Sequence, residues 1–215
     1  MRINIVSGDA MAQYGDQLGF KNCIAFAESM VNGHVQNTVP FSQDFMHERA
    51  KTLSVGYDKY KKRFLTLLKM RAGDEVHVYF GEDLFCQLNL ITLLAYLERI
   101  GIKSVTYHVV FEDEMKQTAE IPDISTQGFA EIYKSVLVEH KIVSTPVEII
   151  NKGLLLYSDY LDENGRLATF IKENPNDTVL QLTVKIVCQL PEYGLGDKQC
   201  EEIIKKIREN TTENQ

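Results

Sequence analysis

Short β-branched segments alternate with helix-like segments through the first half of the chain, and this alternation restricts the possible folds most strongly. The clearest strand is residues 75–80, Glu-Val-His-Val-Tyr-Phe, which ends at Gly81 and is followed by an apolar helical segment at residues 83–99. Further strands are expected at residues 2–6, 23–26 and 104–111. Strands separated by helical crossovers pair in parallel with right-handed connections. The pattern predicts an α/β fold with a small parallel, Rossmann-like sheet in the N-terminal half.

The second half of the chain has a different character, because helical spacing predominates there. Helices are expected at residues 127–140, 146–160, 165–172, 175–190 and 197–208. Asn164-Gly165 and Asn174-Pro175 provide breaks between them. We therefore divide the chain into an α/β domain at residues 1–120, an all-helical domain at residues 121–210 and a frayed tail at residues 211–215, which has no apolar residue to anchor it.

Charge and composition argue against several classes of protein. The 215 residues include 23 basic and 30 acidic side chains, and the net charge of -7 makes nucleic acid an unexpected partner. The most apolar stretch, residues 84–97, contains Gln87 and Asn89 and is shorter than the roughly 20 residues that cross a bilayer. No membrane association is expected. Because the first residues do not resemble a secretory signal, we expect a cytoplasmic protein.

Carboxylate groups follow every predicted strand. In open parallel sheets, ligands collect at the carboxyl ends of strands, where loops and helix N-termini converge. If the first and third strands are neighbours, Gly8-Asp9 and Gly81-Glu82-Asp83 face each other across a switch point of the sheet. Ala27-Glu28 and Glu112-Asp113-Glu114 follow the other two strands. The candidate ligand-binding residues are Gly8, Asp9, Glu28, Arg49, Gly81, Glu82, Asp83 and Gln87.

Two interpretations of these residues stand side by side. In the functional one, Asp9 and Glu82 bind Mg²⁺ or Mn²⁺, or act as general acid and base. Arg49 then clamps a substrate anion, and Gln87 selects the ligand through a hydrogen bond. In the structural one, Asp9 and Asp83 cap the N-termini of the following helices. Arg49 is then an ordinary solvated surface charge.

Other kinds of chemical site find little support in the residues. Gly8 and Gly81 belong to no G-x-G-x-x-G or G-x-x-x-x-G-K-[ST] motif, and no G-x-S-x-G or H-E-x-x-H motif occurs. His77 and His108 lie inside predicted strands and are interpreted as core histidines. The turn at residues 190–200 is compatible with a helix-turn-helix, but balanced charges on the last helix favour plain packing. Four cysteines without a C-x-x-C pair are interpreted as reduced core residues: Cys23, Cys86, Cys188 and Cys200.

Several separated segments together resemble one bacterial family over about the first 110 residues. They are Val6-Ser7-Gly8-Asp9 with Leu18, Phe26-Ala-Glu-Ser-Met-Val-Asn-Gly33, Arg49, and Val78-Tyr-Phe-Gly-Glu-Asp-Leu-Phe-Cys-Gln-Leu88, with looser similarity at Leu190-Pro191 and Gly194-Leu195. The family is the one termed domain of unknown function 1835. The chain departs from its pattern at His34, where proline is frequent, and at Tyr79-Phe80, which replace a frequent tryptophan. The resemblance implies an α/β N-terminal part and a helical C-terminal part, and it assigns no activity.

Two hypotheses of function follow. The leading one is a cytosolic α/β protein that binds a small polar ligand at the edge formed by Asp9, Glu28, Glu82 and Asp83, with or without a divalent cation and with or without catalysis. The alternative is a non-catalytic regulatory or interaction module whose helical C-terminal half docks a protein partner.

Overall fold

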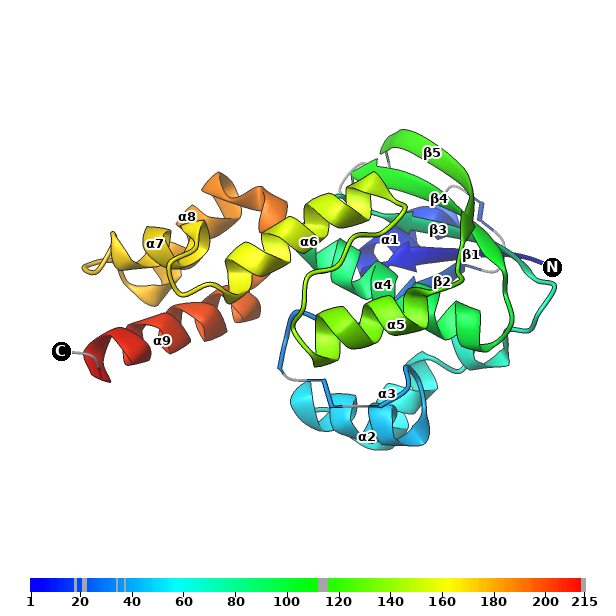
Figure 1. Ribbon diagram of the computed structural model, residues 1–215, viewed down its shortest axis with the longest axis horizontal. Coiled ribbons are helices and arrows are strands. Elements are labelled where there is room, and N and C mark those ends of the chain that lie inside the picture. The colour runs from blue at the N-terminus through cyan, green and yellow to red at the C-terminus, as the bar shows by residue number, and fades with distance from the viewer. Residues whose placement is uncertain (18, 21–22, 34, 37, 112–115, 214–215) are drawn as a thin grey trace.

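The computed structural model describes residues 1–17, 19–20, 23–33, 35–36, 38–111 and 116–213 (Figure 1). Its strands are β1 (Arg2–Ser7), β2 (Cys23–Phe26), β3 (Glu75–Phe80), β4 (Ser104–Phe111) and β5 (Lys116–Ser125). Its α-helices are α1 (Gly8–Gln17), α2 (Gln43–Thr52), α3 (Tyr57–Arg63), α4 (Leu84–Arg99), α5 (Phe129–Tyr133), α6 (Glu148–Leu161), α7 (Arg166–Lys172), α8 (Val179–Gln189) and α9 (Asp197–Glu213). Short 3-10 helices lie at Leu67–Lys69 and Pro191–Tyr193, and a π-helical turn at Lys134–Val138 continues α5.

The strands form one sheet in the order β2-β1-β3-β4-β5. Strands β1, β2, β3 and β4 are parallel to one another, and β5 is antiparallel to β4. The predicted α/β fold, with a mainly parallel sheet in the N-terminal half and helices in the C-terminal half, is confirmed. β1 and β3 are neighbours, as the site hypothesis required. Because the chain goes from β1 to β2 on one side and places β3 on the other, the switch point lies between β1 and β3.

The two faces of the sheet are covered by different helices. Successive residues of a strand point to opposite faces, so Ile5 belongs to the main hydrophobic core and its neighbour Val6 to a smaller one. The main core lies on the face that packs against α4, and Val78 and Phe80 contribute to it. The smaller cluster, on the face covered by α1, unites Val6, Met11, Tyr79 and Val110.

α4 is the central helix of the main core, as its apolar sequence predicts. Thirteen of its sixteen residues are buried, because it contacts the sheet on one side and helices α5 and α6 on the other. Asp83 caps its N-terminus and accepts a hydrogen bond from the backbone N–H of Cys86 at 2.8 Å. The buried side chains include the polar residues Gln87, Asn89 and Thr92. The amide groups of Gln87 and Asn89 and the Thr92 hydroxyl each donate hydrogen bonds within the fold, whereas Gln87 Oε1 has no partner among the described residues.

The predicted boundary at residue 120 requires a correction. β5 crosses this position and continues to Ser125, so residues 121–125, expected in the helical domain, belong to the sheet. β4 would otherwise leave an open edge, and β5 pairs with that edge, for example through Tyr107 and Ile121. α9 likewise continues to Glu213, beyond the expected start of the tail at residue 211. Residues 214 and 215 lie outside the described part of the chain.

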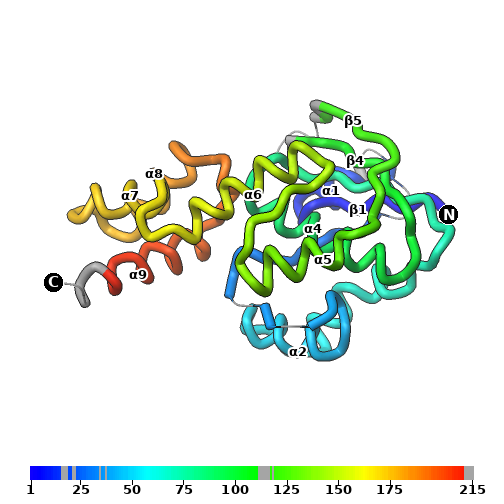
Figure 2. Tube along the Cα trace, in the orientation of Figure 1, coloured from blue at the N-terminus to red at the C-terminus, as the bar shows by residue number. Residues whose placement is uncertain are grey.

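The C-terminal helices extend from one end of the α/β part (Figure 2). α6 runs from the sheet region to α7, α8 and α9, and the two termini lie at opposite ends of the molecule. The turn before α9 is seated on the start of α4: Gly194, at φ 60°, lies so close to Asp83 that a Cβ atom would overlap its carboxylate. Gln199 of α9 donates to Ser29 Oγ at 3.2 Å and to Asn32 Oδ1 at 3.1 Å.

Within the described ranges, no helix is both long and apolar enough to span a membrane.

The prediction of core cysteines holds for only part of the set. Cys86 and Cys200 are buried and Cys23 is half-buried, whereas Cys188 of α8 is exposed. None of the four is in a disulfide bond. Burial of Cys188 was expected because its neighbours in the sequence are apolar. The side chain lies on the exposed face of α8, so this expectation is wrong.

His77 and His108 are core histidines, as predicted, with 8% and 4% of their surface exposed. A 2.9 Å hydrogen bond joins His77 Nδ1 to His108 Nε2, and the Tyr79 ring stacks on His108 with centroids 4.3 Å apart. His108 Nδ1 lies 3.3 Å from Glu120 Oε2. Burial disfavours the charged imidazolium and lowers the pKa of His108, although the nearby Gln117 and Glu120 act in the opposite direction.

We expect acidification to destabilise the fold through His108. In the unfolded chain this side chain binds a proton near the ordinary pKa of about 6.5, whereas in the folded protein it does so only at lower pH. Its contribution to stability is therefore complete above about pH 6.5 and decreases as the pH falls from there toward the folded-state pKa. Urea unfolding between about pH 5 and pH 8 should show a weaker pH dependence for His108→Gln than for the wild type. Equal pH dependence in the two proteins would contradict this assignment.

Candidate functional site

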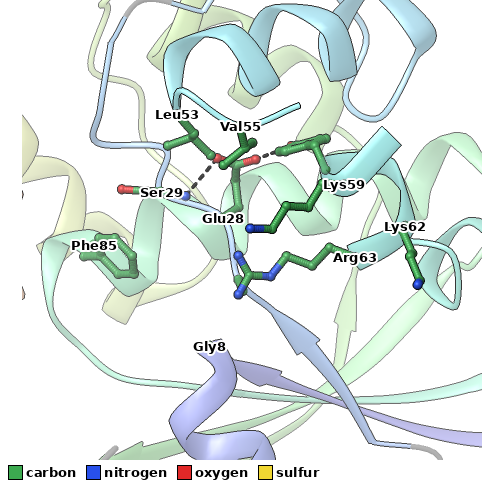
Figure 3. Close-up of a pocket in the computed structure, with 11 residues that line it drawn as sticks. Gly8, Glu28, Ser29, Leu53, Val55, Lys59, Lys62, Arg63 and Phe85 are labelled. Carbon is green, nitrogen blue, oxygen red and sulfur yellow. Dashed lines mark hydrogen bonds between the residues drawn. The ribbon is translucent and has the colours of Figure 1, made fainter. Parts of the chain in front are cut away.

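A cleft of about 700 Å³ lies at the carboxyl ends of β1 and β2, between α3 and the first turn of α4 (Figure 3). Ligand sites of open parallel sheets are found at this edge, and the volume is typical of a small-molecule site. The residues that line the cleft are Gly8, Ala27, Glu28, Ser29, Leu53, Val55, Lys59, Tyr60, Lys62, Arg63 and Phe85.

The wall at the end of β2 is built around a buried ion pair between Glu28 and Arg49 of α2. Neither side chain has exposed surface. Arg49 Nη2 and Nε lie 2.9 Å and 3.2 Å from Glu28 Oε1. The guanidinium also donates to the backbone carbonyl oxygens of Asn32 at 2.8 Å and Ser29 at 2.7 Å. These charge-assisted hydrogen bonds offset the cost of removing both ions from water.

Two further elements close around Glu28. Tyr60 of α3 donates its hydroxyl to Glu28 Oε2. Burial, together with the neighbouring Glu28 carboxylate, raises the pKa of Tyr60 far above its ordinary value, so the phenol stays protonated and remains a donor. Asn89 of α4 donates to the backbone oxygen of Glu28 at 2.8 Å and accepts from the N–H of Met30 at 3.0 Å. The end of β2 is therefore bonded to α2, α3 and α4.

This geometry corrects the roles expected for Glu28 and Arg49. Glu28 lines the cleft, as expected, but both of its carboxylate oxygens are bonded to side chains of this chain. Arg49 is neither a surface charge nor a residue of the cleft lining. Its guanidinium is directed at Glu28 and the following loop, so it acts as a structural counter-ion and not as a clamp for a ligand anion.

Asp9 forms an ion pair with Arg63 of α3. The two side chains are about half exposed, with 58% and 47% of their surface accessible. Gly8 and Arg63 both line the cleft, so the ion pair links the end of β1 to α3 beside the cavity. The Asp9 carboxylate is thus paired with a cation of this chain.

The other predicted residues gather at the end of β3, outside the cleft lining. Gly81, Glu82 and Asp83 follow this strand, and Asp83 is the N-cap of α4, as the structural interpretation expected. The same expectation is wrong for Asp9, which lies inside the first turn of α1 and not at the cap position. Gln87 is directed inward, where its amide donates to the Gly81 carbonyl oxygen at 2.5 Å and to the Tyr107 hydroxyl at 2.9 Å. Glu82 is exposed. The expected single pocket is therefore divided, with Gly8 and Glu28 at the cleft and these four residues beside it.

In the described part of the chain, no three His, Cys, Asp or Glu side chains come together as a group able to hold a metal ion. Asp9 and Glu82, the pair expected to bind Mg²⁺ or Mn²⁺, therefore belong to no such group. Three features named from the sequence, Leu18, His34 and the acidic run Glu112-Asp113-Glu114, lie outside the described residues.

Sequence reasoning missed the cations of the cleft, which are Lys59, Lys62 and Arg63. They occupy positions i, i+3 and i+4 of α3 and so share one face of the helix. In Figure 3 the side chains of Lys59 and Arg63 extend into the space between Glu28 and Gly8. The run Lys59-Tyr-Lys-Lys-Arg63 was the available signal. This run lies in the crossover between two strands, whereas the site hypothesis started from the residues at the carboxyl ends of strands.

Comparisons of the chain with protein-family models, with curated proteins and with solved structures found no match. The likeness to domain of unknown function 1835 therefore stays a resemblance.

We expect Arg49→Met to destabilise the protein by about 3–5 kcal/mol, because it leaves the Glu28 carboxylate buried without a counter-ion. Urea denaturation gives the free energy of unfolding. The double variant Glu28→Gln/Arg49→Met should recover part of the loss, since it removes the uncompensated charge.

Arg63→Met is the matched control for this experiment. It breaks an exposed ion pair, which contributes less than about 1 kcal/mol. If Arg49→Met cost no more than Arg63→Met, the buried pair would not have the structural role assigned to it.

Proposed function

We propose that this protein binds a small organic anion in the cleft at the carboxyl ends of β1 and β2. The observation that carries the proposal is the position of Lys59, Lys62 and Arg63 on one face of α3, lining a cavity of about 700 Å³. The sequence led to the hypothesis of a small polar ligand. The present proposal specifies that this ligand is an anion and that cations recognise it.

The charges around the cleft support this choice. Glu28 is neutralised by Arg49, and Arg63 is balanced by Asp9. Lys59 and Lys62 form no ion pair with any residue that the structure describes. Two positive charges in a concave site raise the local concentration of anions and bind phosphate or carboxylate groups.

The proposal concerns binding and not turnover. The groups with acid–base capability in the described lining of the cleft are Glu28 and Tyr60 and the three cations of α3. Glu28 and Tyr60 are bonded to each other, and Arg49 forms an ion pair with the Glu28 carboxylate. A binding protein therefore fits this wall better than an enzyme that moves protons through it.

Lys59→Gln and Lys62→Gln should each weaken the binding of inorganic pyrophosphate by about three- to tenfold at low salt, since each removes one charge-assisted contact. Isothermal titration calorimetry measures the change. Lys61→Gln is the matched control: it removes the same charge from the same helix, but Lys61 lies over the Tyr57 ring and does not line the cleft. Equal losses in all three variants would indicate a non-specific effect of net charge and would contradict the proposal.

Asp9→Asn distinguishes this proposal from a cation site at the same place. If the ligand is an anion, removal of the competing Asp9 carboxylate frees Arg63 and should strengthen pyrophosphate binding by about two- to fivefold. If Asp9 instead holds Mg²⁺ or Mn²⁺, pyrophosphate should bind the wild type only when the metal is present, and Asp9→Asn should lose this binding. That result would contradict the anion proposal.

A second candidate function, protein interaction through the helical half, is favoured by an apolar stripe on α8. Leu180, Val184 and Val187 recur at i, i+4 and i+7, and 73%, 56% and 43% of their surface is exposed. They border a groove of about 290 Å³ that also reaches the start of α9. Such spacing is typical of a helix that packs against another helix. We propose a second copy of this chain as the partner, because one helix face can pair with itself about a two-fold axis.

Leu180→Glu should abolish a concentration-dependent dimer, because it places a charge in the apolar contact. Analytical ultracentrifugation of the full chain provides the measurement. Leu155→Glu is the control, since Leu155 of α6 is 68% exposed but lies outside the stripe. A wild-type protein that stays monomeric up to high concentration would rule out this candidate.

A further inference from the structure

The lining of the cleft has two chemically different sides. The cations of α3 form one side, and in Figure 3 Phe85 lies across the cavity from Lys62. The apolar side consists of Ala27, Leu53, Val55 and Phe85. A ligand that fills the cavity must therefore combine a charged group with an apolar body.

Phe85 is an exception within α4. The residues on either side of it, Leu84 and Cys86, are buried in the core, and Phe85 remains half-buried in the lining of the cleft. Asp83 caps the N-terminus of this helix, so Phe85 lies in its first turn. A large aromatic ring at the wall of a concave site keeps apolar surface that a flat ring of a ligand can cover by stacking.

The net charge of the site limits the charge of the ligand. With the Glu28–Arg49 and Asp9–Arg63 pairs each neutral, Lys59 and Lys62 leave two positive charges. A phosphomonoester carries about -1.5 to -2 at pH 7, so a single phosphate balances this charge. The cavity is much larger than a phosphate alone and has room for a ring system attached to it.

We infer that the ligand is a nucleoside monophosphate, with its phosphate at Lys59 on the cationic side of the cleft and its base stacked on Phe85. The inference rests on the proposed anion-binding function and names the class of anion. The sequence contains no glycine-rich phosphate loop of the dinucleotide or nucleoside triphosphate type, so the phosphate is held by lysine side chains.

Calorimetry on the full chain tests the inference with ribose 5-phosphate and the four common ribonucleoside monophosphates as probes. At least one nucleotide should bind about tenfold or more tightly than ribose 5-phosphate, because base–aromatic stacking adds to the phosphate contact. Phe85→Leu preserves an apolar side chain at this position. It should weaken the best nucleotide by about fivefold or more and leave ribose 5-phosphate unchanged. Lys59→Gln should weaken both ligands by a similar factor, and Lys61→Gln neither.

The outcomes separate the inference from the function on which it rests. If ribose 5-phosphate and every nucleotide bind equally well, the base is not recognised and the inference is overturned, while anion binding stands. If a nucleotide binds tightly and Phe85→Leu has no effect on it, the stacking assignment is overturned. If none of the probes, pyrophosphate included, binds at low salt, the proposed function itself fails.

Discussion

The ion pair between Glu28 and Arg49 is the interaction on which the geometry of the cleft depends. After β2 the chain has no regular secondary structure through Asn32, so its backbone polar groups need partners from elsewhere. Arg49 provides them for the carbonyl oxygens of Ser29 and Asn32, and Asn89 does so for Glu28 and Met30. One arginine from α2 thus replaces the hydrogen bonds that a strand or helix would supply. This allows a buried loop to form one wall of a cavity.

The same loop connects the α/β part to the C-terminal helices. Gln199 of α9 bonds to Ser29 and Asn32, and Glu202 accepts from the Asn32 amide at 2.6 Å. Nearby, the turn at Gly194 is seated on the Asp83 cap of α4. The two parts therefore meet along the carboxyl edge of the sheet, next to the cleft. A fragment that ended at residue 120 would lose these contacts as well as half of β5.

Three acidic residues at the strand ends serve the structure, and the cations of a crossover helix give the cleft its charge. Glu28 neutralises Arg49, Asp9 pairs with Arg63, and Asp83 caps α4. Each carboxylate thus has a partner within the chain. The rule that ligands bind at the carboxyl edge of a parallel sheet pointed to the edge where the cleft lies, but it placed the pocket between the ends of β1 and β3, whereas the cleft lies at the ends of β1 and β2. It carried no information about which side chains from the helices would face that edge.

The sequence by itself determined the fold class, the strands Cys23–Phe26 and Glu75–Phe80, the burial of α4 and the capping alternative for Asp83. These features are local, because they follow from hydrophobic periodicity and from the residue that precedes a helix. Only the tertiary structure decided the rest, including the addition of β5 to the edge of β4. The partners of the charged side chains also depended on it: Glu28 and Arg49 are 21 positions apart along the chain, and Asp9 and Arg63 are 54 positions apart. Whether a charge faces a ligand or a counter-ion depends on distances in space between such segments, and a pattern of neighbouring residues does not encode those distances.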